Sequence, residues 1–256
     1  MYASSDIRKG SQRSGGPMNI ESTKGKDAVT EDRALTIRDA LRDAIMDRRL
    51  APGARLVEAE VGALFHVSRT VSRAALQMLA FEGLVRIERN RGAFVSHPSP
   101  EEARQVFAAR RVIEPAIVAA AMAHLTAEDI AALRRQLKEE ARHLGGKGTA
   151  GRRAEIQASG DFHLMLASRA GNEILKRFMD ELVARSSLVI ALYGRSAVSS
   201  CGHSEHLALL DAIEAKDEGL AEELMLRHIE HMEADLDLRS PEPLSLRDAL
   251  ALQLPR

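Results

Sequence analysis

The chain has 256 residues, 45% of them hydrophobic, so it is long enough to bury the cores of two domains. Its 36 Lys and Arg residues nearly balance its 37 Asp and Glu residues, and the formal net charge of −1 excludes a partner recognised by bulk electrostatics alone. A single cysteine excludes an internal disulfide framework and is typical of a reducing cytoplasm, and no apolar run approaches the length of a membrane span.

The N-terminal segment, residues 1–30, is rich in Ser, Gly, Lys and Arg and has few aliphatic residues, so we expect a disordered tail. A stripe of apolar residues at helical spacing then runs through Ala34–Arg49 and stops before Pro52. This segment is predicted to be the support helix of a first domain, residues 31–97.

Two short helices are predicted next, at Glu58–Phe65 and Arg69–Phe81, and Ser68 is a good N-cap for the second. The connection between them is short enough for the turn of a helix-turn-helix, whose second helix would enter the major groove of DNA. We expect four polar residues on the face of this helix opposite its apolar stripe: Arg69, Thr70, Ser72 and Arg73.

After Gly83 the hydrophobic period changes from 3.6 to 2, which predicts a β-hairpin with a glycine-containing turn. The tip of this hairpin is basic and could reach phosphate or the minor groove through Arg89, Arg91 and Gly92. Between Ser68 and Arg91, five Arg face only two Glu, so the positive charge is local, as expected for DNA binding through one patch.

The second half of the chain, residues 98–240, shows helical periodicity and no strand pattern. Helices are predicted near residues 100–122, 126–143, 152–170, 172–194, 204–216 and 218–238. Their short connections predict an antiparallel bundle of six to seven helices. The predicted fold class is therefore mainly α, a winged helix-turn-helix with a small hairpin wing followed by an all-α bundle. Residues 241–256 are expected to form a C-terminal tail.

Three histidines occupy core-facing positions on three different predicted helices: His163, His206 and His228. A single core histidine is more often a packing residue, but three on facing helices predict a divalent metal site, because imidazole is the commonest metal ligand. Uncoordinated pocket histidines are the alternative. Cys201, in the predicted loop before His206, is either a small buried residue or a further ligand.

Two arginines, Arg110 and Arg185, share these core-facing positions, and Ser159 lies on the stripe of His163. A buried guanidinium needs a counter-charge. Glu114 lies one turn from Arg110 and could neutralise it, whereas no acid lies on the stripes themselves. The alternative is that the arginines bind the carboxylate of a small anionic effector, with Ser159 lining the same pocket.

The first domain resembles the winged helix of GntR-family transcription regulators. The matching runs, in order, are Leu50–Leu56, Val67–Thr70, Glu82–Val85 and Arg91–Val95. The resemblance implies DNA contacts by the side chains of Ser68, Arg69, Thr70 and Arg73 and by the wing tip at Arg91 and Gly92. This sequence has Val71, Ser72 and Ala74 where the family commonly has Pro, an aliphatic residue and Glu, and Ala59 at a basic contact position. These differences concern the operator sequence and the affinity.

The second domain resembles the helical effector domain of the FadR subgroup of the same family. The matching runs include Arg110–Pro115, Thr126–Asp129, Phe162–His163, Ala170–Asn172, Glu205–His206 and Arg227–Ile229. The resemblance implies a dimeric, ligand-binding bundle that often holds a metal through His and Asp, here expected to be zinc or nickel. The subgroup commonly has Asp at the position of Ser159. Either a ligand atom or water takes the place of that carboxylate, or metal binding is weakened or lost.

We therefore predict a cytoplasmic, homodimeric transcription regulator, by family habit a repressor, that binds double-stranded operator DNA and senses a small carboxylate metabolite. A regulator whose effector is the metal ion itself is the first alternative. A metal-dependent hydrolase is the second, because three His with an open coordination position also suit hydrolysis. An architectural DNA-binding protein with a vestigial pocket is disfavoured, because unpaired polar groups in an apolar bundle would destabilise it.

Overall fold

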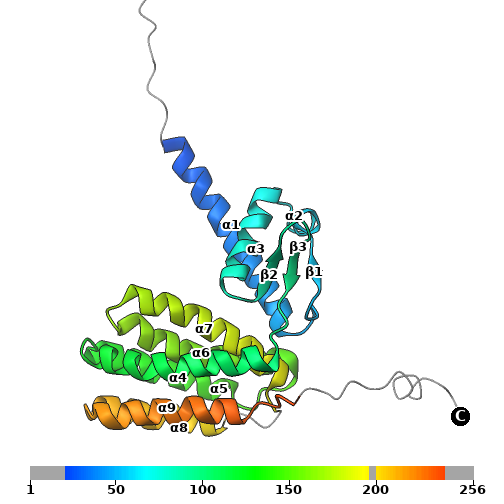
Figure 1. The fold of residues 1–256 in the computed structure, drawn as a ribbon. Helices are drawn as coiled ribbons and strands as arrows, with labels where there is room; N and C mark the ends of the chain where they lie inside the picture. The colour runs from blue at the N-terminus through cyan, green and yellow to red at the C-terminus, as the bar shows by residue number, and fades with distance from the viewer. Residues whose placement is uncertain (1–20, 196–199, 240–256) are drawn as a thin grey trace, which may run out of the picture.

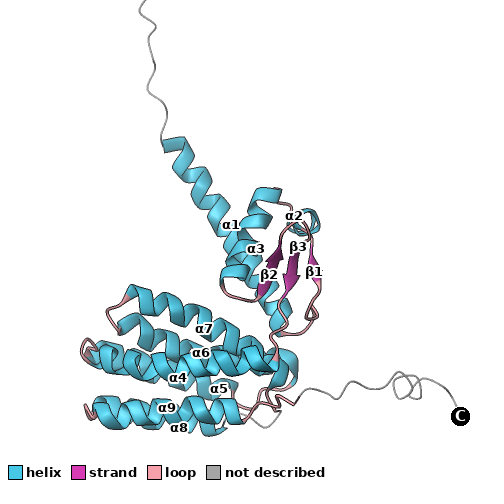
Figure 2. Ribbon diagram, viewed as in Figure 1, coloured by secondary structure: helices cyan, strands magenta, loops and turns pink. Residues whose placement is uncertain are grey.

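The computed structural model describes residues 21–195 and 200–239, which form two domains joined at residues 96–99 (Figure 1). Within these residues the predicted mainly α fold is confirmed, with one small sheet in the first domain (Figure 2). The C-terminal tail predicted at residues 241–256 lies outside the described residues, as does most of the N-terminal one. No described helix has an apolar stretch long enough to cross a membrane.

The first domain packs three helices against a three-stranded antiparallel sheet of order β1-β3-β2 (Figure 2). Its elements are α1 (Glu21–Met46), β1 (Arg55–Leu56), α2 (Glu58–Phe65), α3 (Arg69–Phe81), β2 (Val85–Glu88) and β3 (Gly92–Val95). The first turns of α1 lie inside the predicted disordered segment, so that prediction is wrong from Glu21 onward. Strand β1 was also not predicted, because two residues are too few to show an alternating pattern.

The helix-turn-helix is stabilised by hydrogen bonds in its turn and by the packing of its apolar side chains against α1. His66 ends α2 in the left-handed conformation, with φ 53°, and the Ser68 hydroxyl accepts a hydrogen bond from the backbone N–H of Val71 at 3.4 Å, which caps α3. The buried side of α3 lies in one core with the buried side of α1. The residues on this contact include Ile37, Leu41, Ala75, Leu76 and Leu79.

The second domain consists of the six predicted helices in the part of the chain that the structure describes. They are α4 (Pro100–Met122), α5 (Ala127–His143), α6 (Gly148–Arg169), α7 (Glu173–Tyr193), α8 (Ser200–Glu214) and α9 (Glu218–Ala234). Ser99 caps α4, and Thr126 with Asp129 forms a reciprocal capping box at the start of α5. Phe107, Phe162 and other fully buried side chains fill the bundle core.

Side chains of the bundle reach into the winged domain. Leu188 of α7 is buried in the hydrophobic core of the first domain. Arg48, just after α1, donates a hydrogen bond to the carbonyl of Leu192 at 2.7 Å. Arg153 of α6 forms ion pairs with Asp43 of α1 at 2.7 Å and with Asp47, directly after that helix, at 2.9 Å. The two domains are therefore in contact through α1 and the residues directly after it, which meet both α6 and α7.

Candidate functional site

Most of the predicted DNA-contacting residues are exposed at the start of α3 and at the turn between β2 and β3. The exposed ones are Ser68, Arg69, Thr70, Arg73, Arg89, Arg91 and Gly92. Arg73 forms a two-point ion pair with Glu58 of α2, at 2.9 and 3.0 Å, and this contact lowers the pKa of Glu58. Arg91 pairs with Glu88 in the same exposed setting. Such exposed pairs contribute little to stability, so these guanidiniums can exchange their partners for phosphates.

Ser72 points in the opposite direction, so its predicted place on the DNA-facing side is wrong. Its side chain is fully buried, and its hydroxyl donates to the backbone carbonyl of Ser68 at 3.2 Å. Helix α2 passes close by at Gly62, where an added Cβ would lie 3.1 Å from the Ser72 hydroxyl oxygen. The buried arc of α3 is wide enough to include Ser72 beside Val71, and a small residue is needed there.

The three predicted histidines meet inside the bundle, on α6, α8 and α9. Each of these side chains is buried, with at most 2% of its surface exposed to solvent. The Nε2 atom of His206 lies 3.3 Å from Nε2 of His163 and 3.0 Å from Nε2 of His228. Among the described residues, this is the one group of three or more potential metal-ligand side chains whose ligand atoms converge.

A carboxylate holds the other ring nitrogen of each histidine. The Nδ1 contacts are His163 with Glu114, His206 with Glu140 at 2.9 Å, and His228 with Glu205 at 2.8 Å. An ionised carboxylate fixes the proton on Nδ1, which leaves each Nε2 as a bare acceptor. Three lone pairs therefore face one another without a donor between them.

Glu114 is the one carboxylate that the sequence placed near the site, and two further carboxylates, Glu140 and Glu205, reach it from other positions. Glu140 continues the buried stripe of Leu133 and Leu137 on α5, a signal that the sequence contained. Glu205 is adjacent to His206 and, from the preceding position on α8, reaches the histidine of α9.

The ionised groups around the histidines carry a net negative charge. Burial lowers the pKa values of the histidines, that of His228 to about 4, so the imidazoles are neutral at neutral pH. Burial acts to raise the pKa of Glu140, but the contacts with His206 and His203 outweigh it and lower the pKa to about 2. Glu114 and Glu205 are likewise held ionised. Three carboxylates and the single buried Arg110 guanidinium give a local net charge of −2, which a divalent cation would offset.

The arrangement of ligand atoms also fits a metal ion. A Zn–N bond of about 2.0–2.1 Å, with angles between octahedral and tetrahedral values, separates neighbouring ligand nitrogens by about 2.8–3.4 Å. The two separations to Nε2 of His206, 3.3 and 3.0 Å, fall within this range. Ser159 lines the cavity beside His163 in place of a carboxylate, so at least one coordination position is left for another molecule.

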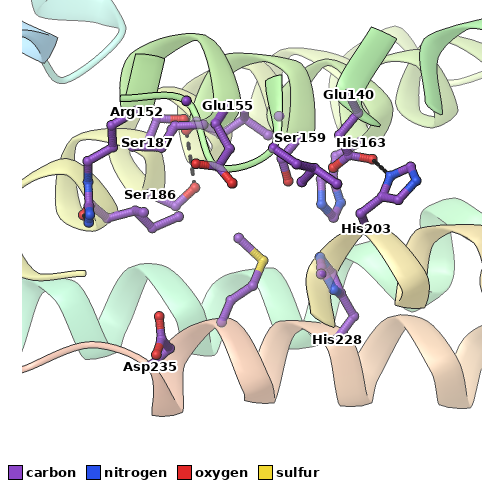
Figure 3. Close-up of a pocket in the computed structure, with 18 of the residues that line it drawn as sticks. Glu140, Arg152, Glu155, Ser159, His163, Ser186, Ser187, His203, His228 and Asp235 are labelled. Atoms are coloured by element: carbon purple, nitrogen blue, oxygen red, sulfur yellow. Dashed lines mark hydrogen bonds and ion pairs between the residues drawn. The ribbon is translucent and has the colours of Figure 1, made fainter. Parts of the chain in front are cut away.

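A cavity of about 390 Å³ opens beside the histidines, and both Arg110 and Ser159 line it (Figure 3). The Arg110 guanidinium forms an ion pair with Glu114 through Nε, and Nη1 donates to the Ser186 hydroxyl at 3.0 Å. Its Nη2 atom is buried and has no hydrogen-bond partner. Arg110 is thus neutralised within the protein and still has a free N–H group.

Arg185 lies outside this cavity, so its predicted place in the pocket is wrong. Its guanidinium binds Glu181 at 2.8 Å and Glu102 at 3.2 Å, and its side chain is about one third exposed. Two acids satisfy it at the domain junction, where it contacts the backbone near Gly83. Cys201 is also placed differently, within α8 and not in a loop, and its side chain is not among those described.

Three further polar residues line the far part of the cavity: Arg152, Glu155 and Asp235 (Figure 3). Glu155 lies one helical turn before Ser159 and Arg152 lies two turns before it, on the stripe of Ser159 and His163, so the periodicity contained this signal. Asp235 directly follows α9 and carried no comparable signal.

A second cavity, of about 460 Å³, lies between the winged domain and the bundle. Asp161, two residues before His163 on α6, lines this second cavity and not the one beside the histidines. Four residues of α6 and α7 line both cavities and form the wall between them: Ile156, Gly160, Val183 and Ser187.

Comparison with known proteins gives matches for both domains. Residues 33–95 match the model of "Bacterial regulatory proteins, gntR family", and residues 105–231 match the model of the FCD domain. The Uxu operon regulator of Haemophilus influenzae is 27% identical over 197 residues, covering 70% of this chain and 72% of that protein. The HTH-type transcriptional repressor NanR of Escherichia coli is 28% identical over 223 residues, covering 77% and 82%.

Among solved structures, a protein described as a GntR transcriptional regulator from Rhodococcus sp. RHA1 superimposes with a TM-score of 0.65. It is 27% identical, and the match covers 79% of this chain and 96% of that one.

Proposed function

Because the chain belongs to the GntR family of bacterial regulatory proteins and carries an FCD domain, we propose that this DNA-binding transcription regulator is a homodimeric repressor controlled by a metal and a small carboxylate. Both families and the similar proteins are regulators and not enzymes, which removes the support for a hydrolase. The sign of regulation follows NanR, whose name describes that protein as a repressor. A protein that acts on the chromosome of a bacterium works in the cytoplasm.

The winged domain supplies the DNA-binding half of the proposal. The exposed N-terminal turn of α3 would lie in the major groove, where Arg69 and Arg73 can reach base edges or phosphates. Arg89 and Arg91 at the wing tip would contact the backbone or the minor groove. Two domains in a symmetric dimer would bind two half-sites, which predicts a pseudo-palindromic operator.

The observation that carries the effector half is the convergence of three bare Nε2 atoms beside a cavity, which His163 and His228 line. His163, His206 and His228 would hold the ion, and the ion would supply positive charge that attracts a carboxylate. The free Nη2 of Arg110 can donate to the same carboxylate. The effector would act by binding more tightly to the domain arrangement that does not bind DNA.

Metal content tests the proposed ion site. Purified protein loaded with zinc or nickel and then desalted should retain the metal, measured by inductively coupled plasma mass spectrometry. His206→Ala should lose it, because His206 lies between the other two ligand atoms. The exposed His143, at the end of α5, provides the matched control, and His143→Ala should retain it. Equal retention by both variants would contradict the site.

Operator binding tests the rest of the proposal. Duplexes selected from a random pool by the wild-type protein should bind the Arg69→Ala/Arg73→Ala variant far more weakly, whereas Arg104→Ala, on the exposed side of α4, should bind like wild type. Adding a carboxylate effector to metal-loaded protein should release the duplex. If metal alone switches DNA binding and no carboxylate does, the ion is the effector.

A further inference from the structure

The cavity in the bundle has two chemically different ends (Figure 3). His163 and His228 lie at one end, and Arg152 and Asp235 lie at the other, with Glu155 between them. Apolar side chains line the remaining wall, among them Ile156 of α6 and others from α7 and α9. One carboxylate bound at the histidine end would leave most of the 390 Å³ to the rest of the effector.

Within residues 21–195 and 200–239, four buried side-chain nitrogen or oxygen atoms have no hydrogen-bond partner, and all four belong to residues that line this cavity. They are Arg110 Nη2, Arg152 Nε, Glu155 Oε1 and Asp235 Oδ2. Folded proteins leave few buried polar atoms unpaired, so their concentration in one cavity calls for a partner that fills it. The four comprise two donors, on the arginines, and two acceptors, on the acids.

The unpaired atoms at the far end require a group that both donates and accepts. An apolar chain would leave all of them unpaired, and a second carboxylate would face Glu155 and Asp235 with like charge. An ammonium group could donate to the two acids but offers no acceptor to Arg152 Nε. A hydroxyl group can donate to a carboxylate and accept from a guanidinium. Burial raises the pKa values of Glu155 and Asp235, in keeping with an enclosed setting.

We infer that the effector is a polyhydroxylated carboxylic acid, bound with its carboxylate at Arg110 and the histidines and its hydroxyl groups at Arg152, Glu155 and Asp235. A cavity of 390 Å³ holds on the order of a dozen non-hydrogen atoms, since one water molecule takes about 30 Å³ of liquid. This is the size of a sugar acid with six carbon atoms. The inference rests on the proposed effector site and specifies its ligand.

Isothermal titration calorimetry of the metal-loaded, full-length protein tests the inference with ligands of six carbons. The panel contains three epimeric aldonates (gluconate, galactonate and mannonate), hexanoate, 6-aminohexanoate, adipate and the uncharged polyol glucitol. At least one aldonate should bind about tenfold or more tightly than each of the other four, because only the aldonates match both ends. Tighter or equal binding of hexanoate, 6-aminohexanoate or adipate would overturn the inference.

Variants locate the hydroxyl groups. Glu155→Gln and Asp235→Asn should each weaken the aldonate by about tenfold while leaving metal content and the far-ultraviolet circular dichroism spectrum unchanged. Ser204→Ala, on an exposed position of α8, is the matched control and should bind the aldonate like wild type. Unchanged aldonate affinity in both cavity variants would overturn the assignment of the far end.

The same panel separates this inference from the proposed function. Release of operator DNA by hexanoate or adipate, with no effect of any aldonate, would keep the carboxylate effector and reject the hydroxylated one. Binding of glucitol as tightly as an aldonate would reject the carboxylate and keep the hydroxyl-binding end. If no member of the panel binds the metal-loaded protein, both are rejected.

Discussion

Replacing Glu114 with Gln removes the one negative charge that the structure places against the buried Arg110 guanidinium. Both side chains are about 2% exposed, and the carboxylate also accepts a hydrogen bond from the Nδ1–H group of His163. Removing one partner of a buried ion pair costs about 3–5 kcal/mol, because the remaining charge is desolvated without compensation. We therefore expect Glu114→Gln to lower the free energy of unfolding by this amount in metal-free protein.

Glu140→Gln is the matched comparison. Glu140 is as buried as Glu114, but its side-chain partners are the imidazoles of His203 and His206, so its loss leaves no guanidinium without a counter-charge. We expect a cost of about 1–2 kcal/mol, the range for a weakened buried hydrogen bond. Urea unfolding of chelator-treated protein, followed by circular dichroism, gives both values if the transition is two-state.

A double variant distinguishes the ion pair from general damage to the bundle. Glu114→Gln combined with Arg110→Met removes both charges, so its cost should be clearly smaller than the sum of the two single costs. The reasoning is refuted if Glu114→Gln costs no more than Glu140→Gln, or if the two single costs add.

Three further outcomes are expected. Gly83→Ala should lower the melting temperature more than Gly53→Ala. Both glycines have φ near +77°, but only at Gly83 would the new Cβ also collide with the side chain of Arg185, at 2.7 Å. Equal shifts of the melting temperature would contradict this reasoning. Arg153→Ala should speed amide hydrogen exchange in α1, because it removes the ion pairs to Asp43 of that helix and to Asp47 directly after it. Unchanged protection would show that these ion pairs do not hold the domains together. Metal-free protein should lose stability as the pH falls from about 6.5 to 4. Burial depresses the pKa of His228 to about 4, so the unfolded chain binds more protons in that window; melting curves at pH 7.5 and 5 measure the loss, and an equal melting temperature would contradict it.

The fold was predictable to the extent that its elements repeat a pattern over several turns or residues. Helices α4 to α9 each carry a stripe long enough to predict them, and the hairpin β2–β3 shows both alternation and a turn signal. Strand β1 has two residues and contains no pattern of its own. The start of α1 at Glu21 was missed because a solvated polar segment gives no periodicity, whether or not it is helical.

In the site, the residues that share a stripe with the core were found, and those at the boundary of a stripe were misplaced. His163, His206, His228 and Arg110 lie well inside their buried faces and were placed correctly. Ser72 and Arg185 lie at edges, where the neighbouring element decides which way a side chain points. Side chains from different helices, such as Glu205 against His228, meet only through tertiary packing, which single-helix periodicity does not contain.

Arg152 and Arg153 are consecutive residues of α6 whose side chains contact different domains. Arg152 lines the bundle cavity and donates to the carbonyl of Gly194 at 2.8 Å, and Arg153 forms an ion pair with Asp43 of α1 in the winged domain. Between the two cavities α6 packs closely against α7 at Gly160. A Cβ atom added at this position would lie only 2.9 Å from Cγ1 of Val183. Helix α6 is therefore the element that directly joins the bundle cavity to α1 of the winged domain.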